Sequence, residues 1–190
     1  MVIRILALAL LLSALPLRAA EVAGVKLEDR TRVGNSELVL NGAGLRKRAF
    51  FQVYAMGLYL AEKKPAAADA IAAPGAKRVA IHMLRDVDAA TFTEALADGM
   101  RANHDEATMK ALEPRIAQLG AIMEELKQAK KGMAIMLDLQ PGAGTVVVVD
   151  GKPRGKPIAG DDFARALLRI WLGDKPVQDD LKRALLGQAQ

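Results

Sequence analysis

The segment from Leu38 to Leu60, LVLNGAGLRKRAFFQVYAMGLYL, constrains the fold of this chain more than any other. Two apolar runs, Glu37–Leu40 and Phe50–Leu60, flank a polar stretch that contains glycines and cations. The second run is rich in Phe, Tyr, Val and Leu, which suit a pleated and partly buried surface. Its alternation of apolar and polar residues is imperfect, as in strands that are covered on both faces. We therefore predict a β-hairpin with a doubly covered second strand.

Gly42 and Gly44 lie in the polar stretch and are followed by the cations Arg46, Lys47 and Arg48. Glycine permits a positive φ, or a close approach of another backbone where a side chain would obstruct it. A guanidinium binds a carboxylate through two parallel hydrogen bonds. An arginine is more commonly a solvated surface cation. The sequence therefore leaves two interpretations of Arg46 open, a surface cation or a carboxylate-binding group in a cleft.

Two tyrosines occupy the second apolar run. Tyr54 lies eight residues after Arg46, so the two share a face if no bulge intervenes. Tyr59 lies five residues after Tyr54 and is expected on the opposite face. By spacing alone, core packing is a better explanation than ligand contact for Tyr54, and still more so for Tyr59.

The first 20 residues have the pattern of a signal peptide. A short apolar run over 5–15 follows Arg4, and the small residues Ala19 and Ala20 offer a cleavage site. The apolar run is too short to span a bilayer comfortably. We expect cleavage near Ala19 or Ala20, a periplasmic or secreted mature protein of residues 21–190, and no stable membrane anchor after cleavage.

Length and composition limit the remaining possibilities. A chain of 190 residues suffices for one domain with a sizeable core, and no domain boundary is visible. The chain has no cysteine, which excludes disulfides and thiol chemistry. Loss of Arg4 and Arg18 with the signal peptide lowers the net charge from +5 to +3. No cluster of cations alternates with aromatic residues, so nucleic acid is not an expected partner.

The rest of the sequence predicts an α+β fold. Strands are expected at 21–27, 31–40, 78–84, 133–139, 145–149 and 153–158, and helices at 66–73, 89–102, 106–130, 161–171 and 177–186. Gly34–Asn35 marks a possible turn or bulge within the second of these strands. Pro114 predicts a break or kink in the third of these helices. Strands and helices do not alternate regularly, which favours a mainly antiparallel sheet covered on one face by a layer of helices.

Few residues suggest catalysis or metal binding. His82 and His104 are expected in different elements, and we cannot assemble a metal site from them. Ser36 is the only serine after the first 20 residues and has no nucleophile motif around it. GAGLRK lacks the third glycine of a dinucleotide-binding loop. We expect no cofactor and no metal.

Three segments resemble the chalcone isomerase family: GAGLR followed by VYAMGLYL; RDVDAATFTEALADGM; and TVVVVDGKPRGKPIAGDDFARALLRIWLGDKPV. The chain is most similar to bacterial exported chalcone isomerase-like proteins. The resemblance covers nearly all of the mature chain. It implies a chalcone isomerase-like fold, in which a large antiparallel sheet and a helical layer enclose a cleft.

The resemblance also implies a set of site residues. Arg46 occupies the place of the family's substrate-orienting arginine, and the family's catalytic threonine falls on Tyr54. The family's helix with catalytic polar groups falls on Phe92, Ala95 and Gly99, whose side chains cannot form hydrogen bonds. The family's cyclisation reaction would lose most of the transition-state stabilisation that positioned polar groups provide. We therefore expect no chalcone isomerase activity and assign no catalytic residue.

The leading hypothesis is an exported, non-catalytic binder of a fatty acid or a similar lipophilic acid. The family's fatty-acid-binding members use an arginine and a tyrosine at the carboxylate, which implies that Arg46 and Tyr54 hold the head group. Phe92, Ala95 and Gly99 would line the tail, in an apolar cleft with few polar groups.

Two alternatives remain. One is an isomerase or lyase of unknown substrate, with Arg46 as electrophile and Tyr54 as acid. The other is a protein-interaction module of the cell envelope whose protein partner is unknown and whose cleft is filled by side chains. The volume of the cleft distinguishes the module from the two ligand-binding hypotheses.

Overall fold

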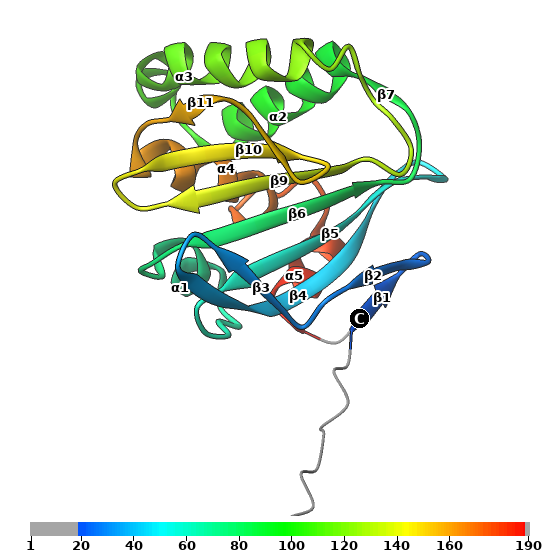
Figure 1. The fold of residues 1–190 in the computed structure, drawn as a ribbon. Helices are drawn as coiled ribbons and strands as arrows, with labels where there is room; N and C mark the ends of the chain where they lie inside the picture. The colour runs from blue at the N-terminus through cyan, green and yellow to red at the C-terminus, as the bar shows by residue number, and fades with distance from the viewer. Residues whose placement is uncertain (1–18, 189–190) are drawn as a thin grey trace, which may run out of the picture.

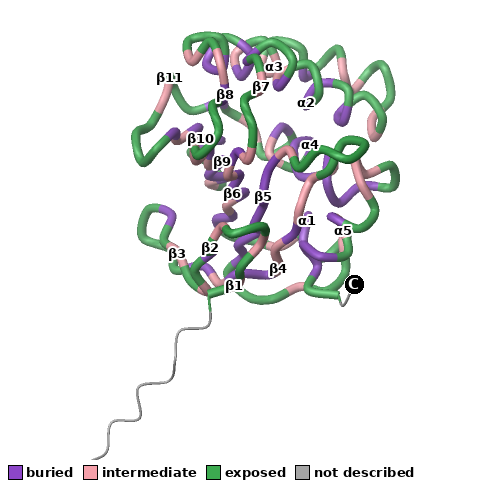
Figure 2. The backbone as a smooth tube through the Cα atoms, turned by 90° about the vertical axis from the view of Figure 1, so that its right-hand side faces the viewer, coloured by how far each residue is buried: buried purple, intermediate pink, exposed green. Residues whose placement is uncertain are grey.

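The computed structural model describes residues 19–188, and residues 1–18, most of the predicted signal peptide, lie outside them. An antiparallel seven-stranded sheet forms the centre, in the order β11-β10-β9-β6-β5-β4-β3. Figures 1 and 2 show α1, α4 and α5 on one side of this sheet, with α2 and α3 at its β11 end. The α+β class and the helix-covered antiparallel sheet are confirmed.

The described elements follow one another along the chain as β1 (Ala20–Val22), β2 (Val25–Leu27), β3 (Arg30–Val33), β4 (Ser36–Arg48), β5 (Phe51–Leu60), α1 (Ala67–Ala72), β6 (Lys77–Met83), β7 (Val87–Asp88), α2 (Ala89–Asn103), α3 (Glu106–Glu124), β8 (Gln128–Ala129), β9 (Ala134–Gln140), β10 (Gly144–Val149), β11 (Lys152–Ile158), α4 (Asp161–Leu172) and α5 (Asp179–Leu185). β1 with β2, and β7 with β8, form two small separate antiparallel sheets.

The predicted hairpin is present as β4 and β5. Its turn lies later than the sequence suggested, because the polar stretch continues β4 as far as Arg48. The chain reverses at Ala49 and Phe50, where Ala49 adopts a φ of 52°. From Tyr54 to Leu60 every residue of β5 is buried, as Figure 2 shows, so the expectation of a strand covered on both faces is confirmed.

Two glycines of β4 give α5 its place on the sheet. A Cβ atom at Gly42 would lie far inside van der Waals contact with the carbonyl oxygen of Ala184. A Cβ atom at Gly44 would lie 2.7 Å from the Cβ atom of Ala184 and 2.9 Å from Leu181. Neither glycine has a positive φ. Their role is therefore the close approach of a helix, one of the two functions predicted for them.

The two faces of the sheet bury separate sets of side chains. The helix-covered face holds the main core, which includes Tyr54 and Trp171. The opposite face holds a smaller cluster of Leu27, Val33, Leu38, Leu40, Tyr59, Ala76 and Ala80, to which the β1–β2 hairpin contributes. Tyr54 and Tyr59 thus face opposite sides of β5, as predicted.

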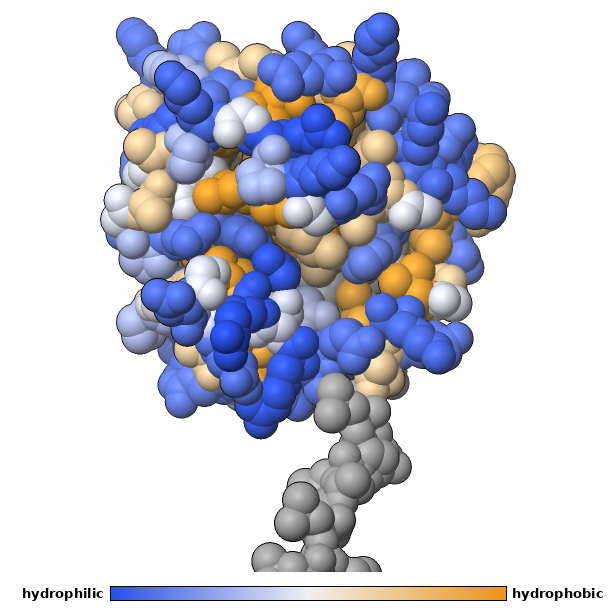
Figure 3. All heavy atoms as spheres, viewed as in Figure 1, coloured by the Kyte–Doolittle hydropathy of each residue, from blue (hydrophilic) through white to orange (hydrophobic). Residues whose placement is uncertain are grey.

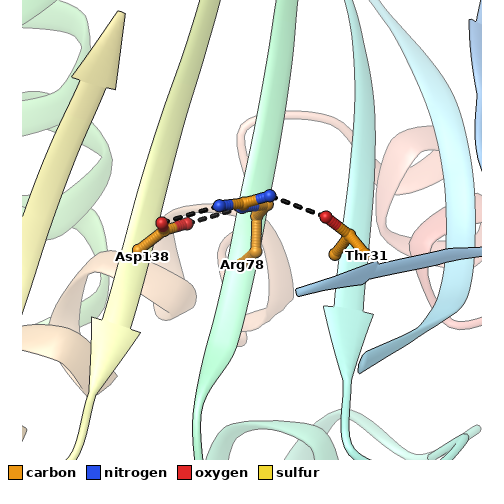
Figure 4. Close-up of polar contacts among 3 residues, drawn as sticks. All are labelled: Thr31, Arg78 and Asp138. Carbon is orange, nitrogen blue, oxygen red and sulfur yellow. Dashed lines mark hydrogen bonds and ion pairs between the residues drawn. The ribbon is translucent and has the colours of Figure 1, made fainter. Parts of the chain in front are cut away.

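A polar bridge spans the outer face of the sheet (Figure 4). Arg78 on β6 donates to both carboxylate oxygens of Asp138 on β9, at 2.6 and 2.7 Å. It also donates to the hydroxyl of Thr31 on β3, at 2.7 Å. β5 and β4 lie between β6 and β3 in the sheet, so this contact requires a sheet curled strongly enough to bring β3 back over it.

Three expectations about individual elements were wrong. The opening strand at 21–27 is instead the β1–β2 hairpin, which turns at Ala23 and Gly24 with positive φ at both residues. α3 runs through Pro114 without a break, since Pro114 and Lys110, whose carbonyl loses its partner, are both exposed to solvent. The same helix ends at Glu124 rather than near residue 130, because the following residues form β8.

Candidate functional site

A cavity of about 950 Å³ lies between α2, the outer half of the β4–β5 hairpin and the segment that joins α4 to α5. Its wall includes Arg46, Tyr54, Phe92, Ala95 and Gly99. The structure therefore brings together all five residues that the sequence proposed as a binding site. Their contact with a ligand stays a prediction.

Arg46 and Tyr54 are direct cross-strand partners in the β4–β5 register. The spacing argument that placed them on one face fails as made, because the register shifts between Arg46 and Lys47, within the segment that joins the pair. The two residues share a face because residues paired across two antiparallel strands project to the same side. The hairpin itself, rather than the count along the chain, positions the pair.

Tyr54 is the buried member of the pair, with 7% of its surface exposed. Its hydroxyl oxygen accepts a hydrogen bond of 3.0 Å from the indole Nε1 of Trp171. Burial raises the pKa of Tyr54, while the Trp171 hydrogen bond and the nearby Arg46 guanidinium act in the opposite direction and do not overcome it. The phenol therefore keeps its proton at neutral pH, and the accepted hydrogen bond leaves that proton available as a donor.

Arg46 is held in place by Gln178, the residue that precedes α5. One guanidinium nitrogen of Arg46 donates to Gln178 Oε1 at 3.3 Å and also to the carbonyl oxygen of Lys47. Gln178 Oε1 accepts a second bond, of 2.8 Å, from the Lys47 amide, and its Nε2 donates to Leu45 at 3.1 Å. The amide thus fixes the end of β4 and the orientation of the guanidinium together.

α2 supplies the apolar wall opposite the hairpin. Phe92 and Leu96 are buried, whereas Ala95 is exposed at the edge of the cavity. Gly99 allows α2 and α4 to approach closely, because a Cβ atom there would lie 2.7 Å from Ile170. Gly99 was proposed as a lining residue, and the structure gives it this additional packing role.

The outer part of the cavity carries charges of both signs. Arg48, Arg85 and Lys175 line it together with Asp86, Asp88, Glu94 and Asp98. Its apolar members there include Phe51, Val53 and Val177. Over residues 19–188 no group of three or more His, Asp or Glu side chains is arranged to hold a metal ion.

Sequence reasoning missed Trp171 and Gln178 as members of the site. Each is a long-range partner, 117 residues from Tyr54 and 132 residues from Arg46 respectively. Trp171 was predicted only as the last residue of the helix over 161–171, and no local pattern marks Gln178. Only the packing of α4 and α5 against the hairpin reveals them.

The two histidines lie away from this cavity. His82 is half-buried on β6, where burial lowers its pKa. His104 follows α2 and lines a second cavity of about 390 Å³, and burial and the nearby Arg169 lower its pKa. The two histidines lie in different elements, as expected, and neither lines the 950 Å³ cavity.

Comparison with known proteins identifies the fold. A crystal structure of a fatty-acid binding protein from Arabidopsis thaliana superimposes with a TM-score of 0.66, at 16% sequence identity, over 86% of this chain and 92% of that chain. No curated protein sequence matches the chain. The family model described as chalcone isomerase-like matches residues 19–187. The chain therefore belongs to the chalcone isomerase-like family and has its fold.

Proposed function

We propose that this protein binds a fatty acid or a similar lipophilic carboxylate, without chemical conversion, in the cavity between α2 and the β4–β5 hairpin. The observation that carries the proposal is a cation and a protonated phenol, Arg46 and Tyr54, side by side in a cavity with apolar walls. Small-molecule sites are commonly cavities of about 300–1,000 Å³ with few convergent polar groups. The 950 Å³ cavity lies within that range of volumes, and α2 gives it an apolar wall, while its outer part carries charged side chains.

The chemistry of the pair suits a carboxylate. The Arg46 guanidinium is always charged and would hold the head group by charge-assisted hydrogen bonds. Tyr54 would donate its phenolic proton to the same group, since its raised pKa keeps it neutral. Phe92, Leu96 and Ile170 would contact the alkyl chain.

The relative of known structure is described as a fatty-acid binding protein, which supports the same class of ligand for this chain. The size of the cavity favours a ligand over the alternative of an interaction module with a filled cleft. The raised pKa of Tyr54 makes it a weaker acid, which disfavours its use as the proton donor of an isomerase or lyase.

The test is fatty-acid binding by calorimetry with wild-type protein and two variants. Arg46→Ala should weaken binding by about tenfold to a hundredfold, because it removes a charge-assisted contact. Tyr54→Phe should weaken it by about twofold to tenfold. Arg32→Ala, which removes an exposed arginine of β3, is the control for net charge. Unchanged affinity in both site variants would refute the proposed site.

We also propose that residues 1–20 direct export and that the mature protein is periplasmic or secreted. No helix among the described residues combines the length and apolar character needed to cross a bilayer. The intact mass of protein recovered from the host's cell envelope would test this. A chain in the envelope fraction that begins near residue 20 or 21 supports export with cleavage, whereas recovery of only the full-length chain, from the cytoplasmic fraction of the same cells, excludes it.

A further inference from the structure

The tip of the β4–β5 hairpin exposes two adjacent aromatic side chains. Phe50 is 87% exposed and Phe51 is 51% exposed, and they are the exposed large hydrophobic side chains of residues 19–188. Their rings lie 5.0 Å apart. Figure 3 shows apolar atoms beside hydrophilic ones at the right-hand edge, where Figure 1 places this tip. Exposed apolar groups gathered at one projecting point indicate a contact surface.

Cations surround these two rings. Lys47 and Arg48 precede them on β4 and are exposed, and no ion pair to either is formed within residues 19–188. The guanidinium of Arg85 lies 4.6 Å from the centre of the Phe51 ring. Carboxylates are also present, since Asp86, Asp88, Glu94 and Asp98 line the adjoining cavity. Asp86 accepts a hydrogen bond from the amide of Lys131, whose side chain adds a further exposed cation.

Rings between cations suit one kind of partner, an anionic lipid surface. Aromatic side chains partition into the region between head groups and acyl chains, while lysine and arginine extend to the phosphates. Each cation near such a surface adds to the attraction. A protein partner of complementary shape would require a broader apolar area than two adjacent rings.

The same tip forms part of the entrance to the cavity. Arg48 and Phe51 line the cavity as well as the tip, and the buried Tyr54 lies further along β5. A molecule entering beside Phe51 would therefore meet apolar wall and then the Arg46–Tyr54 pair. The aromatic tip and the proposed head-group site are two ends of one hairpin surface.

We propose that the β4–β5 tip docks on anionic bilayers, with Phe50 inserted among the lipids, and that the docked protein exchanges its acid ligand with the bilayer through the adjoining entrance. The docking depends only on the tip, whereas the exchange rests on the proposed function. Phe50 does not line the cavity, so its replacement separates the two.

The first experiment measures binding of the full protein to vesicles of phosphatidylcholine with phosphatidylglycerol, by co-sedimentation at low and high salt. Phe50→Ser should reduce partitioning of the protein onto vesicles by about tenfold, because one aromatic ring is no longer buried among the lipids. Lys47→Glu should reduce it by at least about fivefold, and binding of the wild type should fall with salt. Phe50→Leu should restore binding, and Lys152→Glu on β11, which makes the same charge change at the far edge of the sheet, should leave it intact.

The second experiment measures transfer of a fluorescent fatty acid from the same vesicles. Phe50→Ser should slow transfer in proportion to its lost docking, with unchanged affinity for the acid in vesicle-free solution. Docking would be overturned if the wild type did not bind vesicles, or if Phe50→Ser bound them as well as the wild type does. This conclusion would hold regardless of the affinity of the protein for fatty acid in solution. Vesicle binding without any fatty-acid affinity would instead overturn the proposed function and the exchange but support docking. If Phe50→Ser lost binding to a protein partner but kept binding to vesicles, the tip would be a protein interface and the proposal would be refuted.

Discussion

Tyr54 and Tyr59 lie on one strand and face different interiors. Tyr54 meets Trp171 and Arg46 under the helices, while Tyr59 belongs to the small core on the outer face. Burial raises the pKa of Tyr59 to about 12, and the nearby Arg78 lowers it only in part. Both phenols therefore stay protonated at neutral pH, where they act as packing groups or hydrogen-bond donors.

The raised pKa predicts a loss of stability at high pH. In the unfolded chain a tyrosine ionises near pH 10, while folded Tyr59 stays protonated until about pH 12, so its contribution is complete below pH 10 and is lost between pH 10 and 12. Urea unfolding should show a decrease of about 2–3 kcal/mol across that interval. The decrease should be smaller in Tyr59→Phe, and an identical pH profile in that variant would contradict the assignment.

At the scale of residues, the family resemblance in the sequence named the two hairpin residues of the candidate site, and their contact with a ligand stays a prediction. Arg46 and Tyr54 are close in the chain, and a hairpin brings such residues together by local geometry. Their supporting partners, Trp171 in α4 and Gln178 just before α5, lie more than 100 residues away along the chain. Side-chain hydrogen bonds over that distance depend on tertiary packing, which leaves no periodic pattern in the sequence.

Among the elements, the contact between α5 and β4 depends on a residue without a side chain. Gly42→Ala would place a methyl group against the Ala184 backbone, and backbone cannot move aside as a flexible side chain does. We expect this variant to destabilise the protein by about 1–3 kcal/mol, measured by urea unfolding, and to weaken ligand binding through Arg46. The control is Gly120→Ala in α3, where the nearest atom to the new methyl group is a side-chain methyl at 3.3 Å.

An unchanged stability of Gly42→Ala would show that α5 can move away from the sheet without cost.

Most element types were predictable because turn glycines and helical periodicity are local signals, as at Gly34 between β3 and β4. The exceptions were decided by neighbours. Gln128 leaves the predicted helix because it pairs with Asp88, and Lys127 takes a φ of 59° to allow it.

At the scale of the whole molecule, the curled sheet creates two cores. Arg78 links β9 and β3 across the outer core through its bonds to Asp138 and Thr31. Arg78 and Asp138 are 18% and 7% exposed. Removing one partner of such a pair leaves a buried charge without compensation. Arg78→Met should therefore cost about 3 kcal/mol of unfolding free energy, measured in urea.

The double variant Arg78→Met with Asp138→Leu should recover a large part of that loss, because it removes the second charge as well. Additive losses in the double variant would show that the two residues act independently. The sequence predicted the antiparallel sheet and its helical layer but not this curl. Curl arises from the summed twist of many strands and from contacts such as Arg78 with Thr31, between strands that are not neighbours.

The seating of α5 on β4 also bears on how quickly the protein can fold. Asn41 donates to the Leu185 carbonyl oxygen at 2.7 Å across a separation of 144 residues, beside the Gly42 contact. Contacts between segments so distant form slowly, because a long loop must close before they contribute any stability. The β4–β5 hairpin can form early from its own residues. Synthesis and diffusion of the distant helix therefore determine how long the Arg46 strand stays uncovered and open to chaperones or proteases.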